Sequence, residues 1–228
     1  MPADVRTGPA AVLWDFDGTL ADSEPAWRIA ERRLLDELGA EVEPERQLEL
    51  IGLGIVDSAA TMLGWAGRTD LDPVATGHRL GEFALEQLVA EGARFRPGAT
   101  DLLAELRRAG VATALVSMSY TTILAAMVRF LPDDSFDVVL GGDQFVHGKP
   151  HPEPYLRAAE QLGVAPLDCL VIEDSLTGVA SAEAAGMPTL GVPFGQDLTD
   201  GPRRRVVASL AGLGLAEVSA LWRELADA

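Results

Sequence analysis

The stretch "AVLWDFDGTLADSE", residues 11–24, places two aspartates, Asp15 and Asp17, directly after an apolar run. Carboxylates this close repel each other, and burying either without compensation is costly, so the arrangement indicates a bound cation or a reaction that consumes charge. Residues two apart in an extended segment point to the same side, so both aspartates can face one cavity. Gly18 and Thr19 let the backbone turn sharply away. The stretch predicts a buried strand with a charged site at its carboxyl end.

The composition sets the class of protein. A chain of 228 residues that is 48% apolar and 23% charged can bury one good core, with room for a smaller second unit. The sequence has no long apolar run that would predict a membrane helix, and no basic segment followed by an apolar stretch that would predict a secretory signal, so we expect a cytoplasmic location. The sequence does not fix the oligomeric state, and a monomer is the default expectation. The net charge of -17 argues against nucleic acid and anionic membranes as partners. Three arginine clusters are expected to be solvated helix or loop faces: Arg32-Arg33, Arg107-Arg108 and Arg203 to Arg205.

Lys149 is the lone lysine among eighteen lysines and arginines. A chain that uses arginine everywhere else and retains one lysine favours a specific task for it, because a compact ammonium does work that a planar guanidinium cannot; chance survival is the alternative. The single cysteine, Cys169, lies in the apolar run "CLVIE" and is predicted to be a buried thiol, not a nucleophile. His78, His147 and His151 are scattered without cysteine partners, which argues against zinc.

Two kinds of periodicity divide the chain. Residues 24–91 show helical patterns and no clear strand, starting with a helix that Ser23 is expected to cap and Gly39 to end. From residue 94 short apolar runs alternate with helical segments, which is typical of right-handed crossovers and a parallel sheet. The strands predicted there are "VATALVS" (111–117), "FDVVLGG" (136–142), "CLVIEDS" (169–175) and "TLGVP" (189–193). The run before Asp15 joins this sheet, so the helical segment is an insertion after the first strand.

Ligands of such sheets bind beyond the carboxyl ends of the strands, and polar residues gather there. They are Asp15 and Asp17, Ser117, Lys149, and Glu173 and Asp174. Asp174 or Ser175 is an attractive cap for the next helix, but capping does not explain a second acid pair at the same edge. A hard cation with oxygen ligands and several waters explains both pairs, and magnesium is the favoured ion.

Two fragments of nucleotide-binding motifs are incomplete. "GLGIVD", residues 52–57, is half of a dinucleotide fingerprint, but it lies in the helical insertion and follows no strand. "HGKP", residues 147–150, has the Gly-Lys of a phosphate loop but Pro150 where Ser or Thr is needed. Neither fragment supports a nucleotide-binding fold.

Four ordered motifs resemble one family: "DFDGTLADSE", "LVSMS", "GKPHPEPY" and "VIEDSLTGVASAEAAGMPTLGV". The chain is similar to the haloacid dehalogenase (HAD) superfamily, in the branch of small phosphatases and β-phosphoglucomutases with a helical cap inserted after the first strand. The insertion matches in position and helical character only. The resemblance implies a Rossmann-like α/β core of residues 1–22 and 92–228, with a parallel sheet, and a small all-helical cap of residues 23–91.

The resemblance also implies the chemistry of individual residues. Asp15 is implied to be a nucleophile that attacks phosphorus and forms an aspartyl-phosphate. Asp17 is implied to protonate the leaving alcohol oxygen and then to activate the water that breaks the intermediate. Ser117 and the Met118 amide are implied to bind phosphoryl oxygens, and Lys149 to offset the charge of nucleophile and phosphate.

The same resemblance implies the rest of the site. Gly18 and Thr19 belong to the phosphate-binding loop. Mg²⁺ is implied to sit between Asp15, the backbone carbonyl of Asp17 and Asp174, with Glu173 as a direct or water-linked ligand. The residue set of the expected site is therefore Asp15, Asp17, Gly18, Thr19, Ser117, Met118, Lys149, Glu173 and Asp174.

The favoured function is hydrolysis of a small phosphorylated metabolite such as a sugar or polyol phosphate. A β-phosphoglucomutase is the alternative, but such mutases add a histidine near the position of Trp27 and basic residues in the cap. The insertion has no lysine, and Arg68 and Arg79 remain the candidates to clamp a second phosphate. Asp17 disfavours dehalogenation, since dehalogenases of the family lack that second aspartate. A non-catalytic binding protein on this scaffold is the third hypothesis, although every catalytic residue type is present.

Overall fold

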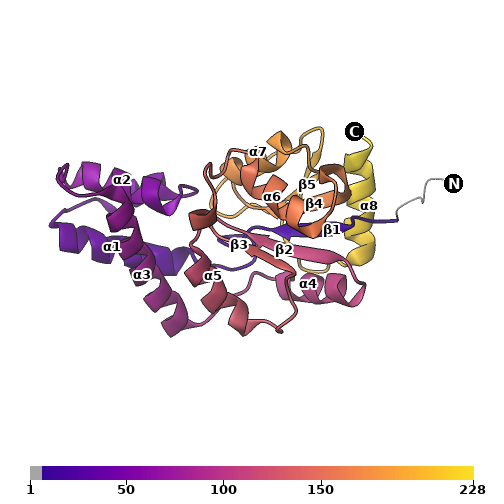
Figure 1. Ribbon diagram of the computed structural model, residues 1–228, viewed down its shortest axis with the longest axis horizontal. Helices are drawn as coiled ribbons and strands as arrows, with labels where there is room; N and C mark the ends of the chain where they lie inside the picture. Colours follow the sequence, from indigo (N-terminus) through magenta and orange to yellow (C-terminus); the bar gives the residue numbers. More distant parts are fainter. Residues whose placement is uncertain (1–6) are drawn as a thin grey trace.

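A computed structural model describes residues 7–228 and shows a six-stranded sheet flanked by helices, with a group of helices beyond one end of it (Figure 1). Every neighbouring pair of strands is parallel, in the order β3-β2-β1-β4-β5-β6. The strands are β1 Ala11–Trp14, β2 Ala112–Val116, β3 Val138–Leu140, β4 Cys169–Glu173, β5 Thr189–Gly191 and β6 Arg204–Val206. The parallel sheet expected from the sequence is confirmed, with β1 in its interior.

Helices cover both faces of the sheet, so each strand buries residues in both directions. Val12 and Trp14 of β1 belong to one core cluster and Ala11 and Leu13 to another, as the alternation of a strand requires. The helices of this unit are α4 Ala99–Arg108, α5 Thr121–Met127, α6 Glu153–Leu162, α7 Leu176–Ala184 and α8 Leu215–Ala226. The first cluster contains residues of α4, α5 and α8, and the second contains residues of α6 and α7. Short 3₁₀ turns occupy Val128–Phe130, Gly142–Gln144 and Pro166–Asp168.

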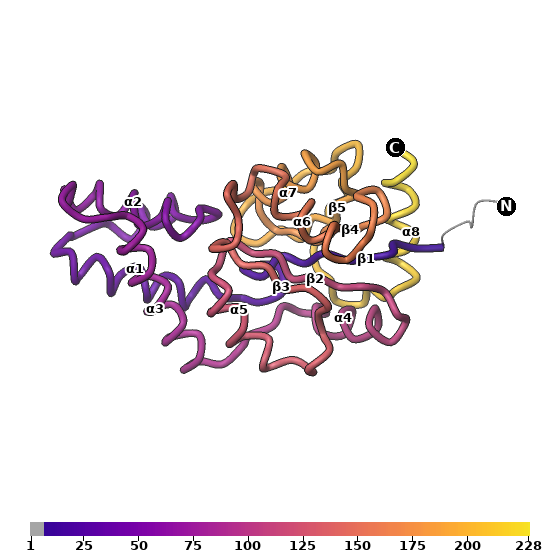
Figure 2. The backbone as a smooth tube through the Cα atoms, in the orientation of Figure 1, coloured from indigo at the N-terminus to yellow at the C-terminus, as the bar shows by residue number. Residues whose placement is uncertain are grey.

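Three of the helices between β1 and β2 form what we call the helical unit, in which the third helix packs against the first two. They are α1 Glu24–Leu38, α2 Ile55–Trp65 and α3 Pro73–Glu91, with a 3₁₀ segment at Pro44–Leu50. Figure 2 shows this part of the backbone extending away from the sheet on the side where the loops after the strands lie. Gly39 ends α1 in the left-handed conformation, at φ 69°, as its position in the sequence predicts. The proposed domain limits at residues 22/23 and 91/92 stay predictions.

One expectation about charge is wrong in part. Arg203 lies in a turn, as the expectation of a solvated loop requires, but Arg204 and Arg205 belong to β6 Arg204–Val206, which pairs with β5 at the edge of the sheet. Acidic side chains compensate the positive charges of these arginines, because Arg204 forms an ion pair with Glu183 at 2.9 Å and Arg205 forms one with Asp200 at 2.7 Å. An edge strand needs no alternation of apolar residues, and charged side chains protect it from pairing with another chain.

Two further expectations concern the rest of the described chain. Cys169 is a buried free thiol, as expected, and burial raises its pKa to about 12, so it is not a nucleophile. No helix within residues 7–228 has the length and apolar character that crossing a membrane requires.

Candidate active site

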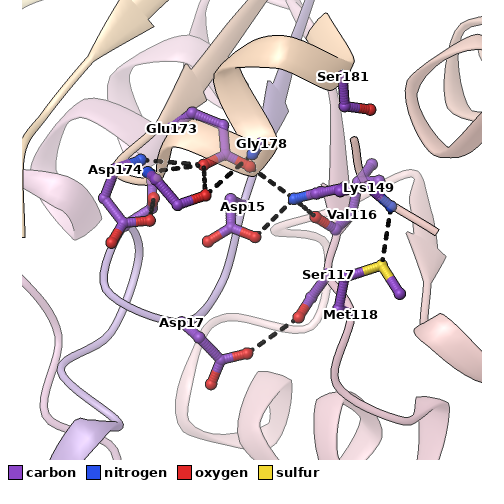
Figure 3. Close-up of polar contacts among 12 residues, drawn as sticks. Asp15, Asp17, Val116, Ser117, Met118, Lys149, Glu173, Asp174, Gly178 and Ser181 are labelled. Atoms are coloured by element: carbon purple, nitrogen blue, oxygen red, sulfur yellow. Dashed lines mark hydrogen bonds and ion pairs between the residues drawn. The ribbon is translucent and has the colours of Figure 1, made fainter. Parts of the chain in front are cut away.

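The residues that follow the strands converge at one edge of the sheet. Asp15 follows β1, Ser117 follows β2, and Asp174 follows β4, while Lys149 comes from the loop after β3 (Figure 3). β1 lies between β2 and β4 and pairs with both, so their carboxyl ends are adjacent. The topology alone thus brings three chain segments that are far apart in sequence to one point.

The ammonium of Lys149 lies at the centre of the cluster. Nζ donates to Asp15 Oδ1 and to Glu173 Oε1, both at 2.7 Å, and to the carbonyl oxygen of Val116 at 2.9 Å. Its side chain is 3% exposed. Burial alone would lower the pKa of Lys149, but the two carboxylates raise it above its ordinary value. The lone lysine is therefore the counter-ion of two buried acids.

Glu173 holds this lysine in place. Its Oε1 also accepts from the hydroxyl of Tyr155 at 2.8 Å, and its Oε2 accepts from the amides of Asp174 and Ser175 and from the Ser175 hydroxyl. Five donors thus occupy a side chain that is fully buried. Both oxygens are engaged, which favours a positioning role and a water-linked contact to a cation over direct ligation.

Asp15 and Asp174 leave oxygen atoms open. Lys149 takes one oxygen of Asp15, and the Thr19 hydroxyl donates to Asp174 Oδ1 at 3.0 Å. Within residues 7–228 no donor reaches the second oxygen of either carboxyl. Oxygen atoms of Asp15, Glu173 and Asp174 all lie within 4.8 Å of one another. Carboxylate oxygens in this number and spacing suit a hard divalent cation that keeps several waters, so the residues fit Mg²⁺.

Burial disfavours the ionised form of these two carboxyls when no cation is bound. It raises the pKa of Asp15 and of Asp174, and the negative charges of their acidic neighbours raise both further, whereas Lys149 lowers them. A divalent cation opposes the same repulsion. The site therefore favours cation binding with release of protons.

Asp17 takes part in a separate set of hydrogen bonds. Oδ1 accepts from the Ser23 hydroxyl at 2.6 Å and from Trp27 Nε1 at 2.8 Å. Oδ2 accepts from the hydroxyls of Ser117 at 3.0 Å and Ser119 at 2.6 Å. Figure 3 shows its carboxyl beside Ser117. The second aspartate thus connects the sheet edge to helix α1.

Ser23 departs from its expected role. It stands at the N-cap position of α1, but its side chain makes no capping hydrogen bond and binds Asp17 instead. Ser175 does cap α7, because its hydroxyl accepts from the amide of Gly178 at 3.0 Å.

The structure brings all nine expected site residues to this edge, although two lie behind the surface. A cavity of about 280 Å³ opens there, a size that suits a small molecule. Asp15, Asp17, Gly18, Ser117, Met118, Lys149 and Asp174 line it. Thr19 and Glu173 are fully buried and support neighbours, so a direct phosphate contact of Thr19 stays a prediction. Met118 contributes its sulfur as an acceptor for the amide of Lys149, at 3.4 Å.

Sequence reasoning missed the side chains that support these residues. Ser23, Trp27, Ser119 and Tyr155 each donate to a site carboxylate, yet each also fits an ordinary role in a helix, turn or core. The available signal was the placement of Ser23, Ser119 and Tyr155 inside the motifs "DFDGTLADSE", "LVSMS" and "GKPHPEPY".

The fold and site define a class: an α/β protein whose acidic site lies at the carboxyl edge of a parallel sheet, beneath a helical insertion. Residues 9–186 match the family model of haloacid dehalogenase-like hydrolases. The chain belongs to this family, which confirms the resemblance seen in its motifs.

Its relatives include phosphatases. The chain is 33% identical to hexitol phosphatase B of Escherichia coli K12 over 92% of its length and 94% of that protein. It is 31% identical to phosphoglycolate phosphatase of the same organism over 81% of both chains. The crystal structure of β-phosphoglucomutase from Clostridium difficile shares the fold, with a TM-score of 0.83 and 22% identity over 95% of this chain and 98% of that one.

Gly178 offers a test of the packing behind the site. A Cβ on Gly178 would meet Glu173 Oε1 at 1.8 Å, so we expect Gly178→Ala to displace the carboxylate that holds Lys149. Overpacking of this kind costs about 1–3 kcal/mol of unfolding free energy, measurable by urea denaturation. Gly64→Ala in α2 is the matched control, because no atom lies within 4 Å of its Cβ, and it should stabilise by up to about 1 kcal/mol. Equal effects of the two substitutions would contradict the packing argument.

Magnesium offers a test of the acidic cluster. A concentration a hundredfold above Kd stabilises by about 2.7 kcal/mol, which raises Tm by roughly 5–10 °C for a chain of this size. Because burial raises the pKa of both open carboxyls, protons compete with the cation, and the rise in Tm should grow with pH through neutrality. Differential scanning fluorimetry with and without Mg²⁺ measures it.

Two variants control this measurement. Asp174→Asn should remove most of the Mg²⁺-dependent rise while keeping the acceptor for Thr19, whereas Asp36→Asn on the exposed side of α1 should keep the rise. A rise that survives in Asp174→Asn would show that the cation binds elsewhere.

Proposed function

We propose that this protein is a Mg²⁺-dependent phosphatase that hydrolyses a small phosphorylated metabolite, a sugar or polyol phosphate, through an aspartyl-phosphate on Asp15. The observation that carries the proposal is the state of Asp15 itself. Lys149 fixes one of its oxygens at 2.7 Å, and the other is free of hydrogen bonds within the described chain while the residue lines the cavity. An oriented, accessible carboxylate beside a buried ammonium suits attack on an anionic phosphoryl group.

The two chemical steps are assigned to the two aspartates. In the first step Asp15 forms a bond to phosphorus, the ester P–O bond breaks, and Asp17 gives a proton to the leaving alcohol oxygen. In the second step Asp17 takes a proton from water, whose oxygen attacks phosphorus and releases Asp15 and inorganic phosphate. Lys149, Ser117 and the amide of Met118 bind the phosphoryl oxygens. Mg²⁺, held by Asp15, the carbonyl of Asp17 and Asp174, would neutralise phosphoryl charge.

Charges around the cavity favour hydrolysis over a mutase reaction. A mutase must hold a second phosphate, which needs free cations on the helical unit. Arg28 lines the cavity but pairs with Glu24 at 3.1 Å. Arg68 pairs with Asp70, and Arg79 pairs with Glu37 and Glu82, and neither arginine lines the cavity. The proposed clamps are therefore engaged elsewhere.

Trp27 argues in the same direction. The resemblance places a mutase histidine near this position, but here an indole donates to Asp17 at 2.8 Å. An indole N–H is only a hydrogen-bond donor and does not ionise near neutral pH, so it can hold the carboxyl but cannot act as a general acid or base. The non-catalytic alternative gains no support, because the nucleophile, acid and lysine occupy one cavity. A cytoplasmic location and a monomeric state remain part of the proposal.

The proposed function predicts distinct losses at the two aspartates. Asp15→Asn should abolish phosphate release from an aryl phosphate and from a hexitol phosphate, because the amide is not a nucleophile. Asp17→Asn should lower kcat for both esters by about 10²–10⁴-fold, because Asp17 is also the base in the breakdown of the shared aspartyl-phosphate. Release of inorganic phosphate in the presence of Mg²⁺ measures both. Full activity of Asp15→Asn would refute the covalent mechanism.

The mutase alternative is tested on one substrate. With β-glucose 1-phosphate and a catalytic amount of the corresponding bisphosphate, we expect inorganic phosphate and glucose, not glucose 6-phosphate. A coupled glucose-6-phosphate dehydrogenase assay detects the isomer. Isomer formation faster than phosphate release would make the protein a phosphomutase.

A further inference from the structure

Glu31 is a buried acid that the proposed reaction does not use. It lies on α1, is 8% exposed, and lines the same cavity as Asp15 and Asp17 from the side of the helical unit. Within residues 7–228 its one hydrogen-bond donor is Gln47, whose Nε2 lies 3.4 Å from Oε2, a long contact. A buried carboxyl with one oxygen unpaired and the other weakly paired is costly for stability alone.

The charges beside Glu31 do not compensate for its burial. Gln47 is neutral and its own oxygen accepts from Arg32, while Arg28 is engaged with Glu24. Burial and the charge of Glu24 raise the pKa of Glu31 to about 8, whereas Arg28 lowers it. Near neutral pH this carboxyl thus both donates and accepts hydrogen bonds, and alcohol hydroxyls match both capacities.

The surroundings of Glu31 give the site its shape. Ser58 of α2 also lines the cavity, is buried, and has no side-chain hydrogen-bond partner among the described residues. The other lining residues of the helical unit are largely apolar: Leu50, Ile51, Leu53, Ile55 and Leu80. A small number of polar groups set in an apolar wall is the usual composition of a small-molecule site.

Helix α1 sets the distance between Glu31 and the residues that contact Asp17. Ser23, Trp27 and Glu31 are four residues apart in turn, so they lie along one face of α1. The first two contact Asp17, which serves the leaving oxygen. Glu31 lies one turn beyond Trp27, about 6 Å along the axis. This separation corresponds to a few carbon atoms, so Glu31 is placed for hydroxyls distant from the ester.

We propose that Glu31 determines substrate specificity by hydrogen bonding the distal hydroxyls of an uncharged, polyhydroxylated leaving group. The inference rests on the proposed phosphatase function and specifies its substrate class. Groups that carry a second phosphate or a carboxylate are disfavoured, because Arg28, the one arginine among the described residues that lines this wall, is already paired with Glu24.

The test compares leaving groups in variants of one residue. Glu31→Leu keeps the approximate size of the side chain and removes both hydrogen-bonding oxygens, whereas Glu31→Gln keeps donor and acceptor. For a hexitol 6-phosphate we expect kcat/KM to fall about tenfold or more in Glu31→Leu, mainly through KM, and to stay within about threefold in Glu31→Gln. For p-nitrophenyl phosphate and phosphoglycolate, both variants should stay within about twofold of the unmodified enzyme.

The controls separate this inference from the proposed function. Asp36→Leu, an exposed acid on the same helix, should leave all three substrates unaffected. An equal loss on all substrates in Glu31→Leu would assign Glu31 a structural role and overturn the proposal, as would no change on the hexitol ester. A wild-type enzyme that cleaves the aryl ester but not hexitol phosphate would overturn the substrate class alone. Failure to cleave any ester would refute phosphatase activity itself.

Discussion

The contact of one ammonium with two buried carboxylates is the interaction on which the site depends. Lys149 lies 2.7 Å from both Asp15 and Glu173, and its charge lowers the pKa of Asp15, which burial and the neighbouring acids raise. A protonated Asp15 is no nucleophile. The fold maintains this balance from behind, because Glu173 receives five hydrogen bonds and helix α7 packs closely against it at Gly178.

This arrangement divides the acids into two groups with different tasks. Glu173 is fully buried and saturated with donors, so it fixes the lysine and does not face the cavity. Asp15 and Asp174 line the cavity and each leaves an oxygen available for phosphorus or a cation. Asp17 is separate from these acids, because three hydroxyls and one indole N–H donate hydrogen bonds to its carboxylate. Asp17, the proposed proton-transfer group, therefore contacts the helical unit as well as the sheet edge.

The sequence predicted the parallel sheet and the convergence of its polar strand ends, because apolar runs and the residues after them are local features that topology then assembles. It did not predict the orientations and hydrogen-bond partners of individual side chains. Ser23 looks like a helix cap and Trp27 like a core residue until the position of Asp17 is known. The sequence did not predict strand β6, because an arginine-rich edge strand lacks apolar alternation. The sequence did not predict Glu31 as a cavity residue, because its burial depends on contacts with the rest of the helical unit.

Helix α1 contacts both the rest of the helical unit and the edge of the sheet. Its buried stripe packs within the helical unit, while one line of residues, Ser23, Trp27 and Glu31, reaches Asp17 and the cavity. In the proposed mechanism, this helix keeps a fixed distance between its contacts with Asp17, the proposed acid, and the proposed contact of Glu31 with the leaving group. A substrate that binds Glu31 therefore also influences the helix that holds Asp17. Binding energy from atoms remote from phosphorus is then used to orient the proton donor, which is how such contacts raise kcat as well as affinity.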